Sequence, residues 1–147
     1  MKKMLTALFC FVLFTQFSAT AQSYKSAVGV RFSNSDAFIG TGISFKHFVK
    51  SNTALEAIMA FDPLALGLMV ERHYPTKAAG LDWFVGGGAY VGFEGRNNLG
   101  LLGIIGIDYK IPQVPLNIAL DWKPELYLIE RTDFEPAAVG VSVRFAF

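Results

Sequence analysis

The chain has 147 residues, of which 52% are hydrophobic, 14% aromatic and 17% charged. Because soluble domains carry roughly 25% charged residues, this composition is unusually apolar. Thirteen basic and twelve acidic side chains nearly balance, which argues against a nucleic-acid-binding protein, since such proteins need a basic surface.

Residues 1–21 have the features of a secretory signal peptide. Lys2 and Lys3 supply a positive start, an apolar run covers 4–17, and a small-x-small cleavage site ends at Ala21. Signal peptides of about 15–30 residues are organised in this way. The single cysteine, Cys10, lies inside this segment. Residues 22–147 are therefore expected to form one domain without disulfides, thiol catalysis or thiolate metal sites.

The mature segment has no run of the ~18 or more apolar residues that a membrane-spanning helix needs. Its apolar residues instead alternate with small or polar residues, which is the period of a β-strand. An exported, apolar chain of this kind buries its apolar side chains in a core or exposes them to lipid as a closed barrel. The predicted strands are 26–32, 38–49, 53–61, 64–74, 81–93, 100–110, 116–123 and 137–147.

Turn-forming residues separate these strands, and the longest predicted connection is 124–136, because Pro124 should end the seventh strand. A helix over 53–69 is the rival interpretation, since Ala, Leu, Met and Glu are helix formers. Asp62-Pro63 and the neighbouring alternation favour a hairpin there. Eight strands of nearly spanning length predict an all-β fold, an eight-stranded antiparallel up-and-down transmembrane β-barrel with both chain ends on one side.

The last predicted strand has one wholly apolar face, and the sequence stops on an aromatic residue. An ordinary strand of a soluble sandwich would show the same alternation. The ending resembles the C-terminal strand of outer-membrane β-barrels, and this resemblance implies recognition by the barrel-assembly machinery. Phe145 and Phe147 are the candidate assembly signal.

Aromatic residues on the apolar faces fall near the strand ends, with aliphatic residues between them. Two aromatic girdles around an aliphatic band are typical of a lipid-facing barrel, whereas core aromatics would gather in mid-strand. Arg72 is the charged exception on this face, and its side chain would extend to the interface. The candidate girdle residues are Tyr74, Trp83, Tyr109 and Phe147 at one rim and Trp122 at the other, with Phe32, Phe61 and Phe93 beside Trp122.

Charged residues of both signs lie on the opposite faces of the strands. A buried charge without a partner costs several kcal/mol, so these residues should neutralise one another. Because an eight-stranded barrel is just wide enough to be filled by its own side chains, we predict a salt-bridged interior rather than an open pore. A solvent-exposed sheet face of a soluble protein is the alternative. The predicted interior network is Arg31, Lys46, Glu56, Glu71, Asp108, Asp121 and Arg144.

Searches for catalytic or ligand-binding motifs return little. His47 and His73 are the only histidines, and two ligands are weak support for a metal site. Glu56 and Glu71 could face each other as paired carboxylates, but an ion network explains them more simply. The glycines at 86–88 do not form a phosphate loop, because no helix or Lys-Ser/Thr pair follows. We expect no enzyme activity, cofactor or metal.

Segments along the whole mature chain resemble the short outer-membrane β-barrel proteins of Bacteroidetes and, more distantly, the OmpA/OmpX-type eight-stranded barrels. The loop at 94–99 is shorter than the acidic loop that relatives often carry. The resemblance implies a fold and an outer-membrane location rather than a chemistry. It rests on G-I-S-F-K-H-F (42–48), A-L-E-A-I (54–58), E-R-H-Y-P (71–75), G-L-D-W-F-V-G-G-G-A-Y-V-G-F (80–93), G-I-D-Y-K (106–110), V-P-L-N-I-A-L-D-W-K-P (114–124) and the terminal V-R-F-A-F.

The first functional hypothesis is a small, monomeric, non-enzymatic outer-membrane barrel with a structural or surface-interaction role. The alternative is a soluble periplasmic β-barrel or sandwich that binds a hydrophobic ligand, in which case the apolar face would point inward. A third hypothesis, a lipid-modifying barrel enzyme, needs a polar triad at the outer rim, where no histidine is predicted.

Overall fold

The computed structural model describes residues 24–34, 37–94, 98–129 and 132–147. The predicted signal peptide, 1–21, lies outside the described residues. The described part contains no helix, and so none long and apolar enough to cross a membrane. The strands are β1 (Ser26–Ser33), β2 (Gly42–Lys50), β3 (Thr53–Phe61), β4 (Leu64–Pro75), β5 (Leu81–Gly92), β6 (Leu99–Lys110), β7 (Leu116–Trp122), β8 (Glu125–Tyr127), β9 (Asp133–Glu135) and β10 (Val139–Ala146).

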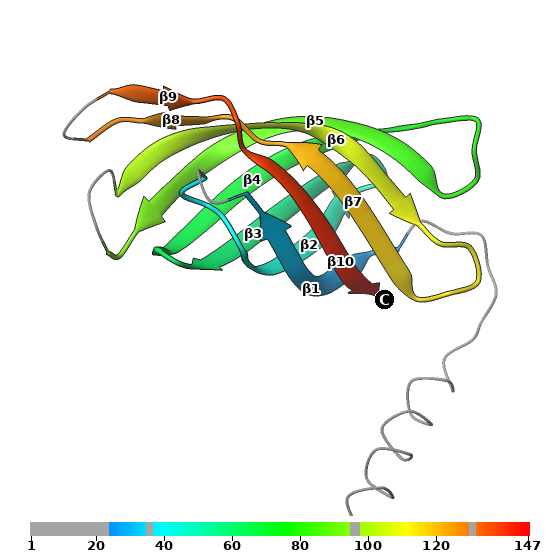
Figure 1. Ribbon diagram of the computed structural model, residues 1–147. Coiled ribbons are helices and arrows are strands. Elements are labelled where there is room, and N and C mark those ends of the chain that lie inside the picture. Colours follow the sequence, from blue (N-terminus) through cyan, green and yellow to red (C-terminus); the bar gives the residue numbers. More distant parts are fainter. Residues whose placement is uncertain (1–23, 35–36, 95–97, 130–131) are drawn as a thin grey trace, which may run out of the picture.

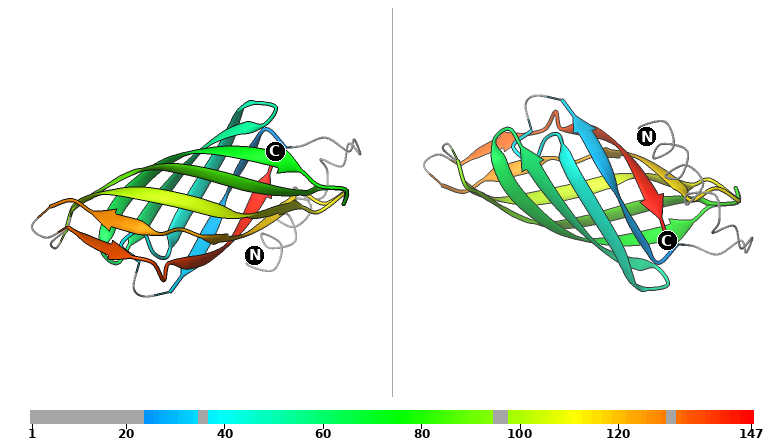
Figure 2. Two further views of the ribbon diagram at one scale, coloured as in Figure 1. Left: turned by 90° about the horizontal axis from the view of Figure 1, so that it is seen from above. Right: turned by 90° about the horizontal axis from the view of Figure 1, so that it is seen from below.

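Eight of these strands form the wall of a closed antiparallel barrel (Figure 1). They are hydrogen-bonded in the order β5-β4-β3-β2-β1-β10-β7-β6, and a further pairing of β5 with β6 closes the circle. In the two views of Figure 2, β5 and β6 run nearly along the length of the molecule, whereas β1, β2 and β3 cross it obliquely. The predicted all-β fold with eight antiparallel wall strands is confirmed.

The barrel has two different ends. At one end Ser26 and Phe147 exchange backbone hydrogen bonds of 2.8 and 2.7 Å, so β1 meets the end of the chain. We call this the turn end, and its connections are 51–52, 76–80 and 111–115. The loop end carries the connections 34–41, 62–63 and 93–98 together with the β8–β9 hairpin, which projects beyond the wall (Figure 2).

The predicted connection at 124–136 is the longest between two wall strands, as expected, but it also contains the short strands β8 and β9. Pro124 lacks a backbone N–H, but its carbonyl oxygen accepts a hydrogen bond of 3.0 Å from Gly103 N–H. Glu125 then pairs opposite Leu102, so β8 continues alongside β6 past the end of β7. A proline removes one donor from a ladder without ending it when the neighbouring groups stay paired.

The predicted second strand, 38–49, begins too early, since β2 starts at Gly42. Sequence alternation put Ile39 on the outer face, whereas Ile39 is fully buried in the barrel. The carboxylate of Glu125 accepts hydrogen bonds from the N–H groups of Phe38 (2.6 Å) and Ile39 (3.0 Å). These backbone contacts turn the connection 34–41 inward and end the alternation.

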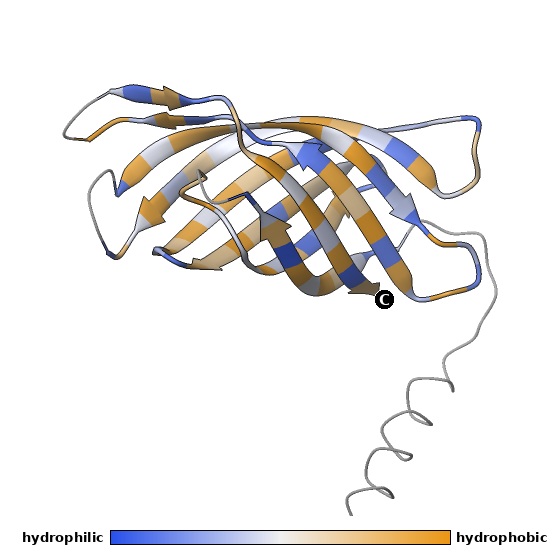
Figure 3. Ribbon diagram, in the orientation of Figure 1, coloured by the Kyte–Doolittle hydropathy of each residue, from blue (hydrophilic) through white to orange (hydrophobic). Residues whose placement is uncertain are grey.

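Hydrophobic and more polar residues alternate along the wall strands (Figure 3), and the exposed positions of this alternation are mostly apolar. In β10, for example, Val139, Val141 and Val143 are exposed while Ser142 and Arg144 are buried. Each of the eight wall strands exposes three or more large hydrophobic side chains. This orientation is the inverse of a soluble domain, in which apolar side chains face the core.

The interior is divided into two parts. Its loop-end half is an apolar cluster that includes Ile39, Ile58, Met69, Leu102 and Ile104, all at most 4% exposed. Its turn-end half holds most of the buried charges, while Glu125 is buried beside Ile39 at the loop end. The prediction of a salt-bridged interior therefore describes only part of the barrel, because residues 37–41 turn inward and bring apolar side chains into the loop-end half.

Candidate functional site

The buried charges of the barrel interior form the candidate site. All seven residues of the predicted network lie inside the barrel with at most 3% exposure. One comes from each of β1, β2, β3, β4, β6, β7 and β10. β5 contributes no charge to this set. Its inward positions include Gly86 and Gly88, where an added Cβ would lie within 2.2 Å of the β4 backbone.

Lys46 on β2 lies at the centre of the network. Its Nζ is 2.7 Å from Glu71 Oε2, 3.3 Å from Asp108 Oδ2 and 3.4 Å from Glu56 Oε2. The ammonium group also sits 4.5 Å from the centre of the Phe84 ring, an arrangement that adds a cation–π attraction. One cation thus joins carboxylates from three strands. Glu56 and Glu71 do not face each other in register, and Lys46 bridges them.

Arg144 on β10 forms the second node of the network. Its guanidinium pairs with Glu56 and donates to Ser44 Oγ at 2.7 Å and to Asn117 Oδ1 at 3.0 Å. Asn117 in turn donates to Asp108 Oδ1 at 2.6 Å. The two nodes therefore share their carboxylates, and the charges form one continuous hydrogen-bonded cluster.

Arg31 and Asp121 form a separate, fully buried pair. The guanidinium donates to both carboxylate oxygens, with 2.7 Å between Nη2 and Oδ1, which is the two-point geometry that makes arginine–carboxylate pairs strong. Gly140 makes room for it, because a Cβ there would lie 2.1 Å from Arg31 Nη2. The network predicted as one set is thus two clusters within the described residues.

Sequence reasoning missed a third buried pair, Lys123 and Glu125, which are 2.5 Å apart. The two residues flank Pro124 with a spacing of two, so a strand continued through the proline would have placed both inside. The sequence gives no indication that the side chain of Tyr24 lies inside the barrel. Its hydroxyl donates to Asp108 Oδ2 at 3.0 Å, although the residue precedes the first strand.

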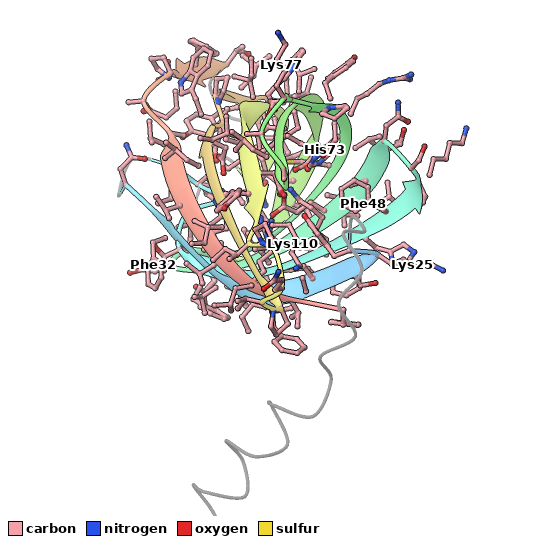
Figure 4. The ribbon with its side chains drawn as sticks, turned by 90° about the vertical axis from the view of Figure 1, so that its right-hand side faces the viewer. Lys25, Phe32, Phe48, His73, Lys77 and Lys110 are labelled. Carbon is pink, nitrogen blue, oxygen red and sulfur yellow. The ribbon has the colours of Figure 1, made fainter. Side chains whose placement is uncertain are left out.

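Aromatic rings close the turn end around this network (Figure 4). Phe48 packs edge-on against Tyr24 and His73, with ring centres 5.2 and 4.8 Å apart, and His73 stacks on Phe84 at 5.0 Å. His73 Nε2 also contacts Glu71 Oε2 at 3.0 Å. The charges are therefore covered by packed rings on the side of the chain ends.

The two histidines lie in different surroundings. His73 faces the interior, whereas His47 Nδ1 is 2.9 Å from the hydroxyl of Ser26 on the neighbouring strand. The described residues contain no group of three His, Cys, Asp or Glu side chains that could hold a metal ion. The buried carboxylates are engaged by cations, so the cluster has the chemistry of a structural ion network.

The candidate girdle residues lie on the outer surface. Tyr74 and Trp83 stack at the turn end with ring centres 4.3 Å apart, and Tyr109 and Phe147 are exposed there. Phe145, half-buried, lies 6.2 Å from Phe147. Trp122 does not lie at the loop-end rim on the side of β6, where the girdle was predicted. It pairs opposite Ile105 in the middle of β6, because β8 extends the wall beyond it.

A shallow groove of about 470 Å³ crosses the outer wall over β5, β6, β7 and β10. Its apolar lining includes Trp83, Ile107, Leu120, Trp122 and Val139.

Neither family models nor curated protein sequences gave a match to the chain. The geometry of the barrel is therefore the basis on which a function can be proposed.

Proposed function

We propose that this protein is a small, monomeric outer-membrane β-barrel whose wall faces lipid and whose interior is a plug of ion pairs and packed side chains. Its role in this proposal is structural or one of surface interaction, without catalysis. The observation that carries the proposal is the inverted distribution of polarity. Apolar side chains cover the outside of every wall strand, while Arg31, Lys46 and Arg144 are buried with their carboxylate partners.

The exposed apolar surface is difficult to reconcile with water on all sides. Soluble monomers rarely expose contiguous apolar patches larger than about 300–600 Å². Here exposed valine, leucine, isoleucine and aromatic side chains run around the whole circumference. An apolar surface of this kind is stable in contact with lipid acyl chains. Closure of the barrel also pairs each wall strand with a neighbour on both sides, as backbone groups inside a bilayer require.

The alternative function, a soluble barrel with a hydrophobic ligand inside, needs the apolar face to point inward. The loop-end half of the interior is apolar, but its side chains, such as Ile58 and Leu102, are packed against one another. A ligand would have to displace them. The ion network would likewise block passage through the turn-end half, which supports a plugged barrel rather than a pore.

The absence of catalysis in the proposal follows from the accessibility of the polar groups. The carboxylates and histidine of the site lie under the rings of Tyr24 and Phe48 or within the wall, where a substrate does not reach them. The C-terminal strand, ending in Phe145 and Phe147, is the proposed contact for the barrel-assembly machinery.

Membrane fractionation with unboiled and boiled gel samples tests the proposal. We expect recovery in the outer membrane and a mobility that shifts on boiling, because a closed barrel resists SDS until heated. Recovery in the soluble periplasm, without a heat-dependent shift, would contradict the proposal and return attention to an internal ligand.

A further inference from the structure

Among the described residues, the exposed charges are unequally divided between the two ends of the barrel. Lys25, Lys50, Arg72 and Lys77 are exposed at the turn end, and Figure 4 shows Lys25 and Lys77 at its margin. None of the four forms an ion pair with another described residue. We call these four residues the basic rim.

The loop end has the opposite character. Its exposed charged side chains among the described residues are acidic, namely Asp62, Glu94 and Asp133. At the turn end, Lys110 is a fifth cation, but its Nζ donates to the carbonyl oxygens of Ile111 and Val114 at 3.0 and 2.7 Å. Within the part of the chain that the structure describes, the exposed positive charge without an ion-pair partner is thus concentrated on the basic rim.

The basic rim borders directly on the apolar wall. Arg72 points outward on β4 and pairs opposite Val85, two register positions from the stacked Tyr74–Trp83 pair and farther from the turn end than that pair. Trp83 also lines the outer groove, which continues over β6, β7 and β10. Arg72 on β4, the aromatic pair and the apolar groove therefore follow one another around the outer surface of the wall.

We propose that this surface binds phospholipids with an anionic headgroup, with the headgroup phosphate held by Arg72 and Lys77 on either side of Tyr74 and an acyl chain in the groove beside Trp83. Guanidinium groups suit phosphate because they present several donors in one plane. An acidic soluble protein would match the charge but would leave the groove and the aromatic pair without a partner. The inference rests on the proposed function, since it requires the wall to face lipid.

Tryptophan quenching by brominated lipids tests the inference. The chain has two tryptophans, so Trp122→Phe leaves Trp83 as the only fluorophore, next to the basic rim. The refolded variant is placed in mixed vesicles of phosphatidylcholine and phosphatidylglycerol, with bromine on the acyl chains of one lipid or the other. We expect phosphatidylglycerol to bind near Trp83 roughly fivefold more strongly, because a basic residue at an anionic surface contributes about that factor.

Two further variants identify the residues responsible. Arg72→Gln combined with Lys77→Gln should bring the ratio of the two binding constants close to one. Asp133→Asn, at the loop end, serves as the matched control and should leave the ratio unchanged. Both changes alter exposed side chains, and the heat-dependent gel shift reports whether each variant has folded.

The possible outcomes separate this inference from the function on which it rests. Equal quenching by both brominated lipids would overturn the headgroup preference and leave the lipid-facing barrel intact. Quenching by neither lipid would overturn both. A preference that persists in the Arg72→Gln, Lys77→Gln variant would contradict the assignment to the basic rim.

Discussion

Lys46 illustrates how one side chain holds several strands of this barrel together. It is fully buried, and its ammonium group contacts carboxylates from β3, β4 and β6. Moving such charges out of water is costly, and their attraction compensates only while every partner is present. The network therefore makes each of its members sensitive to the loss of any other.

Lys46→Met should lower the free energy of unfolding by about 3–5 kcal/mol, because it leaves three buried carboxylates without their shared cation. Urea unfolding in detergent micelles, followed by tryptophan fluorescence, measures the effect. Lys77→Met, at an exposed turn position, is the control and should change stability by at most about 0.5 kcal/mol.

The double variant Lys46→Met, Glu71→Gln should recover part of the loss, since it removes one of the charges left unpaired. Glu71 Oε2 is the carboxylate oxygen nearest to Lys46 Nζ, at 2.7 Å. Strictly additive effects of the two substitutions would show that the pair is not coupled in solution.

At the scale of single elements, we propose that the C-terminal segment, β10 and Phe147, serves both the closed wall and assembly. Its backbone closes the barrel against β1 and β7, whereas the side chain of Phe147 is 62% exposed and makes little contact with the folded protein. An exposed terminal aromatic contributes little to the stability of the barrel, which fits a role during assembly.

Phe147→Ala should therefore leave the unfolding free energy nearly unchanged in micelles and reduce the amount assembled in the outer membrane several-fold. Its backbone hydrogen bonds to Ser26 are retained in the variant. Phe134→Ala on β9, also strongly exposed, is the matched control and should assemble normally. Equal assembly of both variants would remove Phe147 from the proposed signal.

The connection 34–41 depends on an element far from it in the sequence. Glu125 at the start of β8 accepts backbone hydrogen bonds from Phe38 and Ile39 while it pairs with Lys123. This single carboxylate thus joins the inward-turned connection to the β8–β9 hairpin.

Glu125→Ala should release the connection and accelerate chymotrypsin cleavage after Phe38 by an order of magnitude or more, because local opening exposes the backbone to the protease. Mass spectrometry of the fragments identifies the cut. Glu94→Ala removes another loop-end carboxylate and should leave the cleavage rate as it is. An unchanged rate in Glu125→Ala would show that packing of Ile39 alone holds the connection.

At the scale of the whole molecule, substitutions on the outer surface test whether the wall faces lipid, as we propose, or water. Val143 lies in the middle of β10, opposite Val30 and Ile118, with its side chain pointing outward. Val49 is also exposed but lies near the turn end of β2. The two positions therefore differ in their proposed depth in the bilayer.

Val143→Arg should cost about 2–4 kcal/mol of stability in lipid vesicles, and Val49→Arg about 0–1 kcal/mol, since the penalty for a charge falls from the midplane to the interface. Reversible folding into vesicles, titrated with denaturant, measures both. A small and equal effect at the two positions would argue for water around the wall.

Local alternation alone was sufficient to identify the wall strands and the inward charges, including Arg31, Glu56 and Arg144. The reason is that side chains two residues apart in a strand share a face whatever the strand later pairs with. The same reasoning failed at Ile39 and Pro124, where a distant carboxylate and a continued ladder override the local signal.

The choice of partners inside the barrel was decided by the tertiary structure. Arg31 pairs with Asp121, 90 positions away, and Tyr24 reaches Asp108 across the turn end. Such contacts depend on how the closed sheet sets the register and inclination of strands remote in the sequence. The sequence by itself determined which side chains face inward, and closure of the barrel decided which of them meet.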